Sequence, residues 1–276
     1  MLRAVASTGA HVKPGAELGP GAVDLDVEAE DRVTLRAVAE AELGDVPVDV
    51  CVQPAEGRRK RLLIADMDST IIGCECLDEL ADFAGLKPQI AAITERAMRG
   101  ELDFAAALRE RVGMLKGLGL EALQKTYEQR VRLNPGARTF VRTMAANGAR
   151  CVLVSGGFTY FTERVAVAAG FADQRANSLE DDGRSLTGRV GEPILGREAK
   201  LAALQEEAAA IGADLSQALA IGDGANDLAM IHAAGLGVAY RAKPIVAQEA
   251  DARLDHADLS ALLYFQGYRR DEFVTD

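Results

Sequence analysis

Short apolar runs alternate with longer amphipathic segments from about residue 61 onward. The first run, Leu62-Leu-Ile-Ala65, ends at Asp66. Strand-like runs of the same character follow at residues 150–154, 218–221 and 237–240. Runs of four or five mostly apolar residues are typical of strands that are buried on both faces of a parallel sheet. Because the segments between them are predicted as helices, the pattern predicts an α/β fold whose core is a doubly wound, Rossmann-like parallel sheet.

One connection in this pattern is much longer than the others. Between about residues 76 and 136 the sequence is helix-like throughout, with apolar residues three or four positions apart, as in residues 77–84. Residues 134–136, Asn-Pro-Gly, then break the helical pattern. We therefore expect a helical cap at about residues 76–136, inserted after the first core strand. Two short polar strands around residues 181–184 predict a surface hairpin.

Residues 1–57 differ from the rest of the chain. They contain a Gly- and Pro-bearing stretch at 11–22, a charged helix-like segment at about 28–43 and an alternating Val-Pro-Val-Asp-Val-Cys-Val stretch at 46–52. This pattern predicts strand, helix and strand, followed by a linker at 53–57. A segment this short buries little core alone. We expect a small α+β unit, regulatory or dimerising, that packs on the main domain (residues 58–276) or on a second subunit in a homodimer.

Composition and charge narrow the possible functions. The 276 residues are 49% hydrophobic and 26% charged, which fits a folded globular protein. Lys and Arg number 31 against 42 Asp and Glu, a net charge of −11, which argues against a nucleic-acid partner. The main basic run, Arg58-Arg-Lys-Arg61, leads into the first core strand and is interpreted as its solvated start.

The cellular location is also constrained by sequence features that are absent. No apolar run approaches the ~18 residues that cross a bilayer. The opening residues lack the ~7–15-residue apolar stretch of a signal peptide. Four scattered cysteines are too few for a disulfide scaffold. We therefore expect a cytoplasmic protein without a membrane partner.

Polar residues gather where the predicted strands end. In doubly wound sheets, ligands bind beyond the carboxyl ends of the strands. The stretches at these ends are Asp66-Met-Asp68-Ser-Thr70, Ser155-Gly156-Gly157 and Gly222-Asp223-Gly-Ala-Asn226-Asp227, whose last two residues begin a helix. Several carboxylates in one cleft repel one another unless a cation is present. Because hard divalent ions prefer oxygen ligands, this set predicts a Mg²⁺ site.

The two aspartates after the first strand suit a two-step phosphoryl transfer. Asp66 offers a carboxylate that can attack phosphorus and form an acyl phosphate. Asp68, two residues further along, can protonate the leaving alkoxide and later activate water. An Asp-x-Asp pair alone is more often a turn or a helix cap, so this interpretation depends on the other groups at the same edge.

Those other groups are suited to binding a phosphate. The hydroxyl of Ser155 and the backbone N–H groups of Gly156 and Gly157 can hold phosphoryl oxygens, because glycine lets the main chain approach closely. Lys200 can reach the same edge from its predicted helix and neutralise charge on the nucleophile and the transferring group. Asp223 is a further metal ligand. Each group alone is a common loop or surface feature, and it is their joint occurrence at the predicted strand ends that favours the chemical interpretation.

Together, these residues resemble the motifs of the haloacid dehalogenase-type phosphohydrolase superfamily and, within it, of the phosphoserine phosphatase family. The likeness covers roughly residues 61–268, and its four motifs are Asp66-Met-Asp-Ser-Thr-Ile-Ile72, Val154-Ser-Gly-Gly-Phe158, Lys200 and Ile221-Gly-Asp-Gly-Ala-Asn-Asp227. The resemblance implies that Asp66 is the nucleophile and Asp68 the acid and base. It also implies that Asp66, Asp223 and the backbone carbonyl of Asp68 bind Mg²⁺, and that Asn226 lies near the phosphate.

The predicted cap carries residues that the same resemblance assigns to the substrate. Glu75 matches the glutamate that binds the substrate ammonium group, and Arg111 matches the arginine that pairs with the substrate carboxylate. An amino acid presents one cation and one anion, so an acid and an arginine are complementary to it. Met98 and Phe104 match apolar positions that cover the bound substrate and exclude water.

The expected activity is that of a phosphoric monoester hydrolase: Mg²⁺-dependent hydrolysis of O-phospho-L-serine to L-serine and phosphate through an aspartyl phosphate, the last step of serine biosynthesis. Three alternatives stay open at this point. They are transfer of the phosphoryl group to a hydroxyl acceptor such as homoserine, a broad small-phosphate phosphatase, and a serine-binding regulatory protein. Cys74 and Cys76 flank Glu75, but without a second nearby pair they do not favour zinc, and we interpret them as packing residues.

Overall fold

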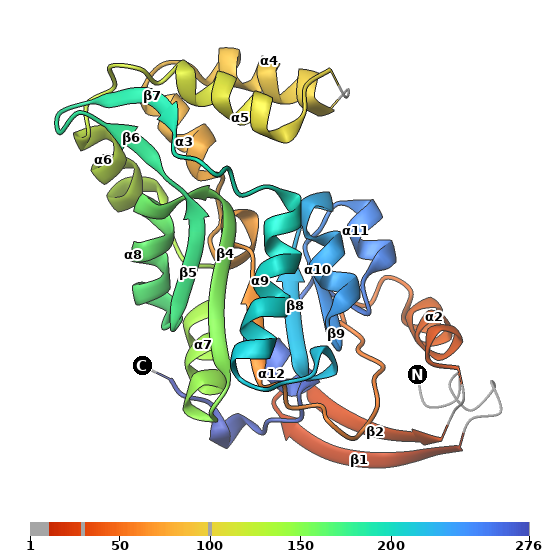
Figure 1. Ribbon diagram of the computed structural model, residues 1–276. Helices are drawn as coiled ribbons and strands as arrows, with labels where there is room; N and C mark the ends of the chain where they lie inside the picture. The colour runs from red at the N-terminus through yellow and green to blue at the C-terminus, as the bar shows by residue number, and fades with distance from the viewer. Residues whose placement is uncertain (1–10, 29–30, 99–100, 276) are drawn as a thin grey trace.

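Residues 11–28, 31–98 and 101–275 are described by the computed structural model (Figure 1). At their centre is a six-stranded parallel sheet with the strand order β10-β9-β8-β3-β4-β5. Its strands are β3 (Leu62–Ala65), β4 (Arg150–Phe158), β5 (Asp173–Asn177), β8 (Ala218–Gly222), β9 (Leu236–Tyr240) and β10 (Ala252–Leu254). The predicted doubly wound α/β fold is confirmed.

The order of strands in the sheet reverses beside β3. From β3 the chain adds β4 and β5 on one side, and it then returns to add β8, β9 and β10 on the other side. Sheets of this kind bind ligands where the order reverses, beyond the carboxyl ends of the two flanking strands. In this chain those strands are β3 and β8, which pair directly with each other.

Helices cover both faces of the sheet (Figure 1). They are α7 (Ala137–Ala146), α8 (Thr159–Ala169), α9 (Arg197–Ala210), α10 (Leu228–Ala233), α11 (Pro244–Glu249) and α12 (Ala261–Phe265). Leu63 and Ala65 of β3 share a core with α7, α8 and α12, whereas Leu62 and Ile64 share a second core with α9 and α10. Because both faces of the strand are covered, all four residues are apolar.

The connection from β3 to β4 forms a helical cap at one end of the sheet (Figure 1). Its helices are α3 (Cys76–Phe83), α4 (Lys87–Met98), α5 (Phe104–Gly113) and α6 (Glu121–Arg130). The chain enters the cap through a turn at Met67–Ile71, and the two connections are bonded to each other. Ile72 pairs with Leu133, and the N–H of Asn134 donates to the carbonyl of Ile71 at 2.8 Å. Among the described residues, none of the helices is both long and apolar enough to cross a membrane.

The hairpin expected near residues 181–184 is present, and it belongs to the cap end of the molecule. Its strands are β6 (Leu179–Asp181) and β7 (Leu186–Val190), which pair antiparallel. Leu186 and Val190 are buried, and the carbonyl of Leu186 accepts a hydrogen bond from the N–H of Gly117 at 2.8 Å. The hairpin therefore packs on the cap through Leu186 and Val190, while its tip and the Arg189 side chain are exposed.

The N-terminal segment lies at the end of the sheet opposite the cap (Figure 1). It consists of an antiparallel hairpin, β1 (His11–Gly19) and β2 (Ala22–Glu28), followed by helix α2 (Arg32–Leu43). The strand predicted at residues 46–52 is wrong, because these residues form no regular strand. Pro47 has no N–H group for a ladder. Val50 and Val52 instead pack their side chains against the Leu35 and Ala39 cluster of α2.

The basic run at residues 58–61 attaches this segment and the C-terminal residues to the sheet. Arg58 Nη1 lies 2.7 Å from Asp24 Oδ2 on β2, and Arg59 Nη2 lies 2.8 Å from Glu272 Oε1. Lys60 is 8% exposed, and its Nζ donates to the carbonyl of Ser216 at 2.9 Å. The predicted solvated strand start is therefore wrong for Lys60, which is buried, and for Arg58, which is partly buried and ion-paired, whereas Arg59 and Arg61 are exposed as predicted.

A buried glutamate fixes helix α9 to the sheet. Oε1 of Glu207 lies 2.6 Å from Arg175 Nη2 on β5, and its Oε2 pairs with Arg150 Nε on β4. Burial acts to raise the pKa of Glu207, but the two arginines outweigh it and hold the pKa below 4.5. A carboxylate with a depressed pKa stabilises the fold at neutral pH, and this contribution is lost as the pH falls through its folded-state pKa.

We therefore expect Glu207→Gln to lower the free energy of unfolding by about 2 kcal/mol at pH 7. The difference from wild type should shrink as the pH falls below about 4.5 and through the lowered pKa of the folded-state carboxylate, because the wild-type side chain then becomes protonated as well. Urea unfolding at several pH values measures both effects. Glu206→Gln is the matched control, since Glu206 also pairs with Arg175 but its side chain is 63% exposed. Equal losses for the two variants would contradict the prediction.

Candidate active site

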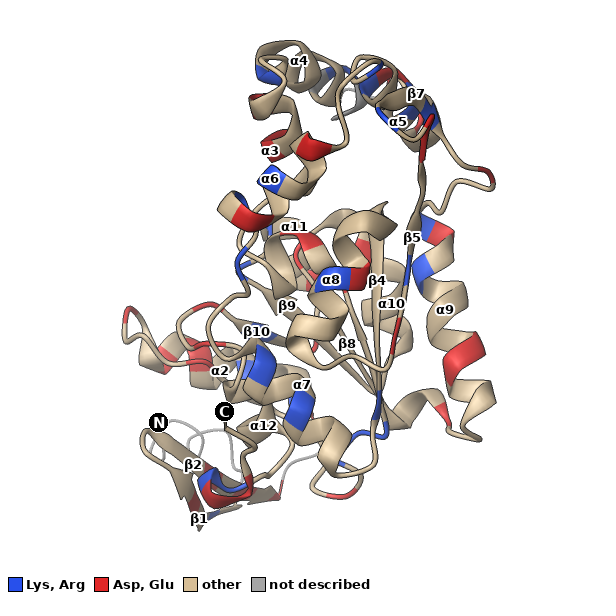
Figure 2. Cartoon of the chain, turned by 90° about the vertical axis from the view of Figure 1, so that its left-hand side faces the viewer, with Lys and Arg blue, Asp and Glu red and all other residues tan. Residues whose placement is uncertain are grey.

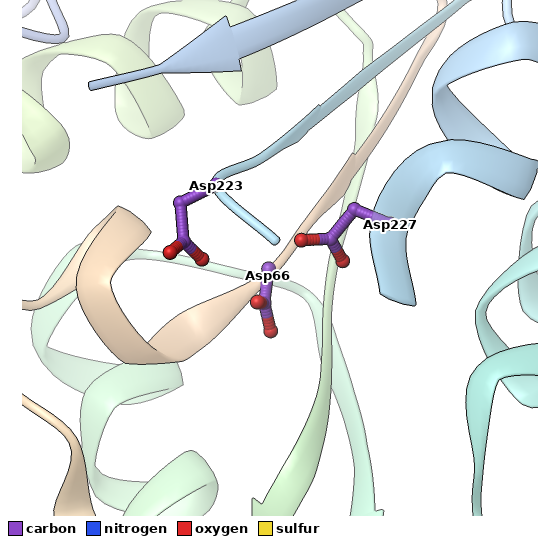
Figure 3. A group of neighbouring side chains, drawn as sticks. All are labelled: Asp66, Asp223 and Asp227. Atoms are coloured by element: carbon purple, nitrogen blue, oxygen red, sulfur yellow. The ribbon is translucent and has the colours of Figure 1, made fainter. Parts of the chain in front are cut away.

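Three aspartate side chains converge beyond the carboxyl ends of β3 and β8 (Figure 3). Asp66 is the first residue after β3, Asp223 is the first after β8, and Asp227 ends the short 3-10 turn at Ala225–Asp227. One oxygen from each carboxylate lies within 4.8 Å of the other two. In the described part of the chain, no other three His, Cys, Asp or Glu side chains come together in this way. The cluster lies where the strand order reverses, which is the expected ligand position in this fold.

Lys200 of α9 lies between two of these carboxylates. Its side chain is buried, and its Nζ is 2.7 Å from Asp66 Oδ1 and 2.5 Å from Asp227 Oδ1. Oδ2 of Asp227 accepts a hydrogen bond from the N–H of Gly224 at 3.0 Å. Asp227, itself fully buried, therefore holds the Lys200 ammonium beside Asp66.

Sequence reasoning missed this role of Asp227, which it treated only as a residue at the start of a helix. A helix-capping aspartate and a buried ion-pairing aspartate cannot be distinguished from the sequence alone. The nearby Gly222 was the available signal. A Cβ atom on Gly222 would lie 2.3 Å from Oδ2 of Asp227, so the strand end has to lack a side chain for the carboxylate to fit.

The Asp66 carboxylate is oriented through one of its two oxygens. Oδ1 accepts the N–H of Met67 at 2.8 Å and also faces Lys200. Oδ2 accepts no protein hydrogen bond within the described residues. One oxygen is thus fixed by the protein, and the other is available for chemistry.

Asp68 and Glu75 lie at the junction between the sheet and the cap. Oδ1 of Asp68 accepts the N–H of Cys76 at 3.1 Å, and its Oδ2 would be 3.0 Å from a Cβ on Gly157. Ser69 has a φ of 55°, an uncommon backbone conformation for a residue with a side chain. Its hydroxyl donates to Glu75 Oε1 at 2.6 Å. The strained turn thereby ties an exposed acid of the cap to the strand end that carries Asp66.

Residues 155–157 form a bulge near the end of β4. Val154 pairs with Arg175, but the next paired residue on β4 is Phe158, opposite Asn177. Bulges of this kind redirect side chains and recur beside active sites. Oγ of the buried Ser155 accepts the N–H of Gly157 at 2.9 Å. The bulge brings this Ser-Gly-Gly loop next to the Asp68 carboxylate, where a side chain at Gly157 would meet it.

The cap extends an aromatic ring over this loop. Phe104, at the start of α5, is 40% exposed. Its Cζ lies 3.2 Å from the position of a Cβ on Gly156, and its Cδ1 lies 3.6 Å from that of a Cβ on Gly196. The phenyl ring therefore covers two glycine backbones, one at the end of β4 and one at the start of α9.

The remaining predicted site residues are Arg111, Asn226 and Met98. Arg111 of α5 is partly buried, which lowers its pKa, while Asp78 and Glu75 act in the opposite direction. Its Nε donates to the carbonyl of Ala107 at 3.2 Å. Asn226 is exposed in the turn before α10. Met98 ends helix α4, and its side chain lies outside the described residues.

The electrostatics of the cluster leave it short of positive charge. Burial and the neighbouring Asp227 raise the pKa of Asp66 well above 3.8, against the pull of Lys200. Burial and Glu75 raise the pKa of Asp68 to about 7, and burial and Asp227 raise that of Asp223 to about 6. Burial acts to lower the pKa of Lys200, but Asp66 and Asp227 outweigh it and hold the pKa above 10.5. One ammonium thus faces several carboxylates, and this donor set fits a hard divalent cation.

Comparison with known proteins shows the family to which the chain belongs. The profile of the haloacid dehalogenase-like hydrolase family matches residues 63–232. A phosphoserine phosphatase of Polaromonas sp. is 46% identical over 208 residues, which cover 74% of this chain and 88% of that protein. A phosphoserine phosphatase of Streptomyces coelicolor is 43% identical over 254 residues, covering 91% of this chain. The chain spans only 62% of the length of that longer relative.

A solved structure resembles the chain as well. It is described as a phospho-aspartyl intermediate analogue of phosphoserine phosphatase, and it superimposes with a TM-score of 0.68 at 36% sequence identity. The match covers 75% of this chain and 99% of that chain.

Proposed function

Because the chain belongs to the haloacid dehalogenase-like hydrolase family, we propose that it is a phosphoserine phosphatase, which hydrolyses O-phospho-L-serine to L-serine and phosphate. The observation that carries the proposal is the Asp66 carboxylate, held 2.7 Å from the buried Lys200 ammonium at the reversal point of the sheet. The likeness to phosphoserine phosphatases of two bacteria supports the choice of substrate. The reaction would be the last step of serine biosynthesis.

In the first half-reaction, Asp66 acts as the nucleophile. Its free Oδ2 forms a bond to phosphorus while the bond between phosphorus and the serine oxygen breaks, which gives an aspartyl phosphate. The leaving alkoxide takes a proton from Asp68. A pKa of about 7 keeps much of Asp68 protonated at neutral pH, as a general acid requires. Lys200 and the Ser155 loop offset the charge on the phosphoryl oxygens.

In the second half-reaction, the same groups act in the reverse sense. The Asp68 carboxylate, having lost its proton, removes one from a water molecule as the water oxygen bonds to phosphorus. The bond between phosphorus and Asp66 Oδ2 breaks, and phosphate leaves. Asp66 regains its carboxylate, which Lys200 and the N–H of Met67 hold for the next cycle.

We propose that Asp66, Asp223 and the backbone carbonyl of Asp68 hold Mg²⁺, with Asp227 holding Lys200. The converging carboxylates, of which Asp66 and Asp223 have raised pKa values, fit such an ion. When bound, Mg²⁺ supplies positive charge that stabilises the carboxylates and the phosphoryl oxygens together.

We assign recognition of the serine part of the substrate to residues of the cap. Glu75 would bind the substrate ammonium group and Arg111 its carboxylate, while Met98 and Phe104 cover the ester and exclude water. Two contacts support this assignment: Ser69 donates to Glu75, and Phe104 lies against the phosphate-binding loop. The charge of Glu75 also acts to raise the pKa of Arg111. Asn226 would lie beside the phosphate.

Arg111→Ala is expected to reduce kcat/KM for phosphoserine by roughly 10- to 100-fold, because a charge-assisted hydrogen bond to the substrate carboxylate is lost. The same variant should hydrolyse phosphoethanolamine, which has the ammonium group but no carboxylate, within about threefold of wild type. Steady-state kinetics with both substrates measure the contrast. Arg109→Ala, on the same helix but paired with Glu192 at 54% exposure, is the matched control. Equal losses on both substrates would remove Arg111 from carboxylate recognition.

A phosphate-release screen tests the activity itself. Phosphoserine, phosphothreonine and sugar phosphates are compared with and without Mg²⁺, and phosphoserine is expected to be the preferred substrate. Uniform activity over all esters would replace the proposal with a broad small-phosphate phosphatase. Added homoserine, with analysis for phosphohomoserine, identifies transfer to another acceptor. Binding of serine without release of phosphate would indicate a regulatory protein.

We infer that the enzyme acts in the cytoplasm on a small molecule and that residues 1–57 are a dimerising or regulatory segment. Exposed apolar side chains on this segment support self-association, namely Val23, Val33, Val46 and Val48. Acidic and basic positions lie near one another on α5 and α6 (Figure 2), which offers no uniformly basic surface there for nucleic acid. Light scattering after size exclusion, on the wild type and on Val33→Asp, tests for the homodimer.

A further inference from the structure

We propose that Asn177 is a positioning residue for phosphoryl transfer, because its side-chain amide joins the phosphate-binding loop at residues 155–157 to the segment that carries Lys200. The inference rests on the proposed function, which assigns that loop and Lys200 to the phosphate. Asn177 itself would touch neither the substrate nor the reacting atoms. It would act through the backbone groups that it holds.

The amide of Asn177 makes three hydrogen bonds to backbone groups of two different segments. Asn177 is the last residue of β5 and is 2% exposed. Its Nδ2 donates to the carbonyl of Gly156 at 2.9 Å and to that of Leu195 at 3.2 Å. Its Oδ1 accepts the N–H of Leu195 at 2.7 Å. Both amide hydrogens and the amide oxygen are therefore used.

The contact with Gly156 replaces a missing hydrogen bond of the sheet. The bulge at residues 155–157 takes the end of β4 out of its ladder with β5. A partly buried carbonyl that leaves its ladder needs another donor. The amide of Asn177 supplies that partner from the neighbouring strand, so the loop keeps its bulged path and stays next to Asp68.

The contact with Leu195 fixes the start of helix α9. An amide that both donates to and accepts from one residue imitates a step of a sheet ladder, so it fixes the direction of the backbone as well as its position. Gly196 caps α9, and Lys200 follows in the first turns of the helix. A shift of Leu195 would therefore move the Lys200 ammonium relative to Asp66. Phe104 lies against Gly156 and Gly196, directly beside the two backbones that Asn177 joins.

This arrangement sets the separation between two groups that would hold the same phosphate. Catalytic groups need placement within about 0.5 Å, and a misplacement of about 1 Å can reduce the rate by about 10²-fold. The other links between β4 and α9 include the ion pair of Arg150 with Glu207, which lies further along the helix from Lys200. Asn177 thus acts at the end of α9 where the chemistry takes place.

The test compares Asn177→Ala and Asn177→Asp with a matched buried amide, Gln266→Ala. Gln266 is 1% exposed and makes comparable backbone contacts near the start of the sheet: its Oε1 accepts the N–H of Lys60 at 3.0 Å, and its Nε2 donates to the carbonyl of Leu262 at 3.1 Å. The readouts are Tm, kcat and KM for phosphoserine and for p-nitrophenyl phosphate, and the inhibition constant of inorganic phosphate.

We expect Asn177→Ala to reduce kcat by roughly 10- to 100-fold on both esters and to raise the inhibition constant of phosphate about tenfold. Asn177→Asp keeps the acceptor for Leu195 but loses the donor to Gly156 and adds a negative charge near the phosphate, so its effect on phosphate should be larger. Gln266→Ala should lower Tm to a similar extent, with kcat and phosphate inhibition within twofold of wild type.

A purely structural role has a different signature. If both Asn177 variants keep kcat and phosphate inhibition within twofold of wild type while their Tm falls as in Gln266→Ala, the proposal is overturned. If Asn177→Ala does not fold, the nearly isosteric and uncharged Asn177→Leu decides the question with the same readouts. If the wild type hydrolyses p-nitrophenyl phosphate but not phosphoserine, the proposed substrate fails, and the effect of Asn177 is still measured on the former ester and on phosphate.

Discussion

Asp66→Asn should lower phosphoserine hydrolysis by at least about 10⁴-fold, because an amide cannot form the aspartyl phosphate and the removal of a nucleophile forfeits the covalent route. The protein should remain folded. The wild-type carboxylate is buried beside Asp227 and its pKa is raised, so its charge is not what holds the fold together. The measurement is single-turnover phosphate release together with thermal unfolding.

Two further observations make this result decisive. Mass spectrometry of the variant excludes deamidation of Asn back to Asp, which would restore activity slowly. Asp173→Asn is the matched control, since Asp173 starts β5, pairs with Arg150 and has a half-exposed side chain. Residual activity of Asp66→Asn above about 1% of wild type, with deamidation excluded, would mean that another group attacks phosphorus.

Removal of divalent metal is expected to reduce turnover by about 10³-fold, because a bound cation supplies several kcal/mol of charge stabilisation at such a site. Treatment with EDTA, followed by addition of Mg²⁺, should abolish and then restore the activity. Far-UV circular dichroism should not change, because the ion would bind at the strand ends outside the two apolar cores. The assay is initial rate against Mg²⁺ concentration.

The variant Asp223→Asn tests whether Asp223 is a ligand of the required metal ion. The variant should need at least tenfold more Mg²⁺ for half-maximal activity, because one of the converging carboxylates has lost its charge. Asp271→Asn, in the C-terminal 3-10 turn, is a control of the same chemistry on the same chain. Full activity in EDTA, or an unchanged Mg²⁺ requirement in Asp223→Asn, would exclude the proposed metal site.

The arrangement of the sheet could be predicted because its cause is local. A strand that is covered on both faces has to be apolar at every position, so β3 stands out in the sequence from Leu62 to Ala65. In a parallel sheet, the residue after such a strand lies at the ligand edge. Asp66 and Asp223 therefore became neighbours in the prediction although more than 150 residues separate them.

The failures have the opposite cause, since each depends on a partner that is distant in the sequence. Alternation at residues 46–52 was consistent with a strand, but Val50 and Val52 pack on helix α2, and no strand among the described residues pairs with this stretch. The ion pairs of Arg58 with Asp24 and of Arg59 with Glu272 were not predicted, because both partners are far away along the chain. A sequence shows that a side chain can form an ion pair, but not which partner comes within reach.

Prediction of the site from the sequence was limited in the same way. Asp227 and Asn177 act on groups that only the folded chain brings close, the first on Lys200 and the second on Gly156 and Leu195. Neither carries a local pattern that distinguishes it from an ordinary helix cap or strand residue. Asp66, Asp68 and Lys200, for which we propose catalytic roles, follow a strand end or match a motif, whereas the residues that hold them in place do not.

The hydrogen bonds between the two connections at the base of the cap suggest that the cap can be replaced as a unit. Ile72 pairs with Leu133, and Asn134 bonds to Ile71, so the point of insertion closes on itself without help from the helices above it. A graft that keeps Glu75 and Cys76, which contact Ser69 and Asp68, should therefore change the choice of phosphate ester while the strand ends stay in place. The transplant has to include the β6–β7 hairpin as well, because the loop at Gly117 is bonded to it.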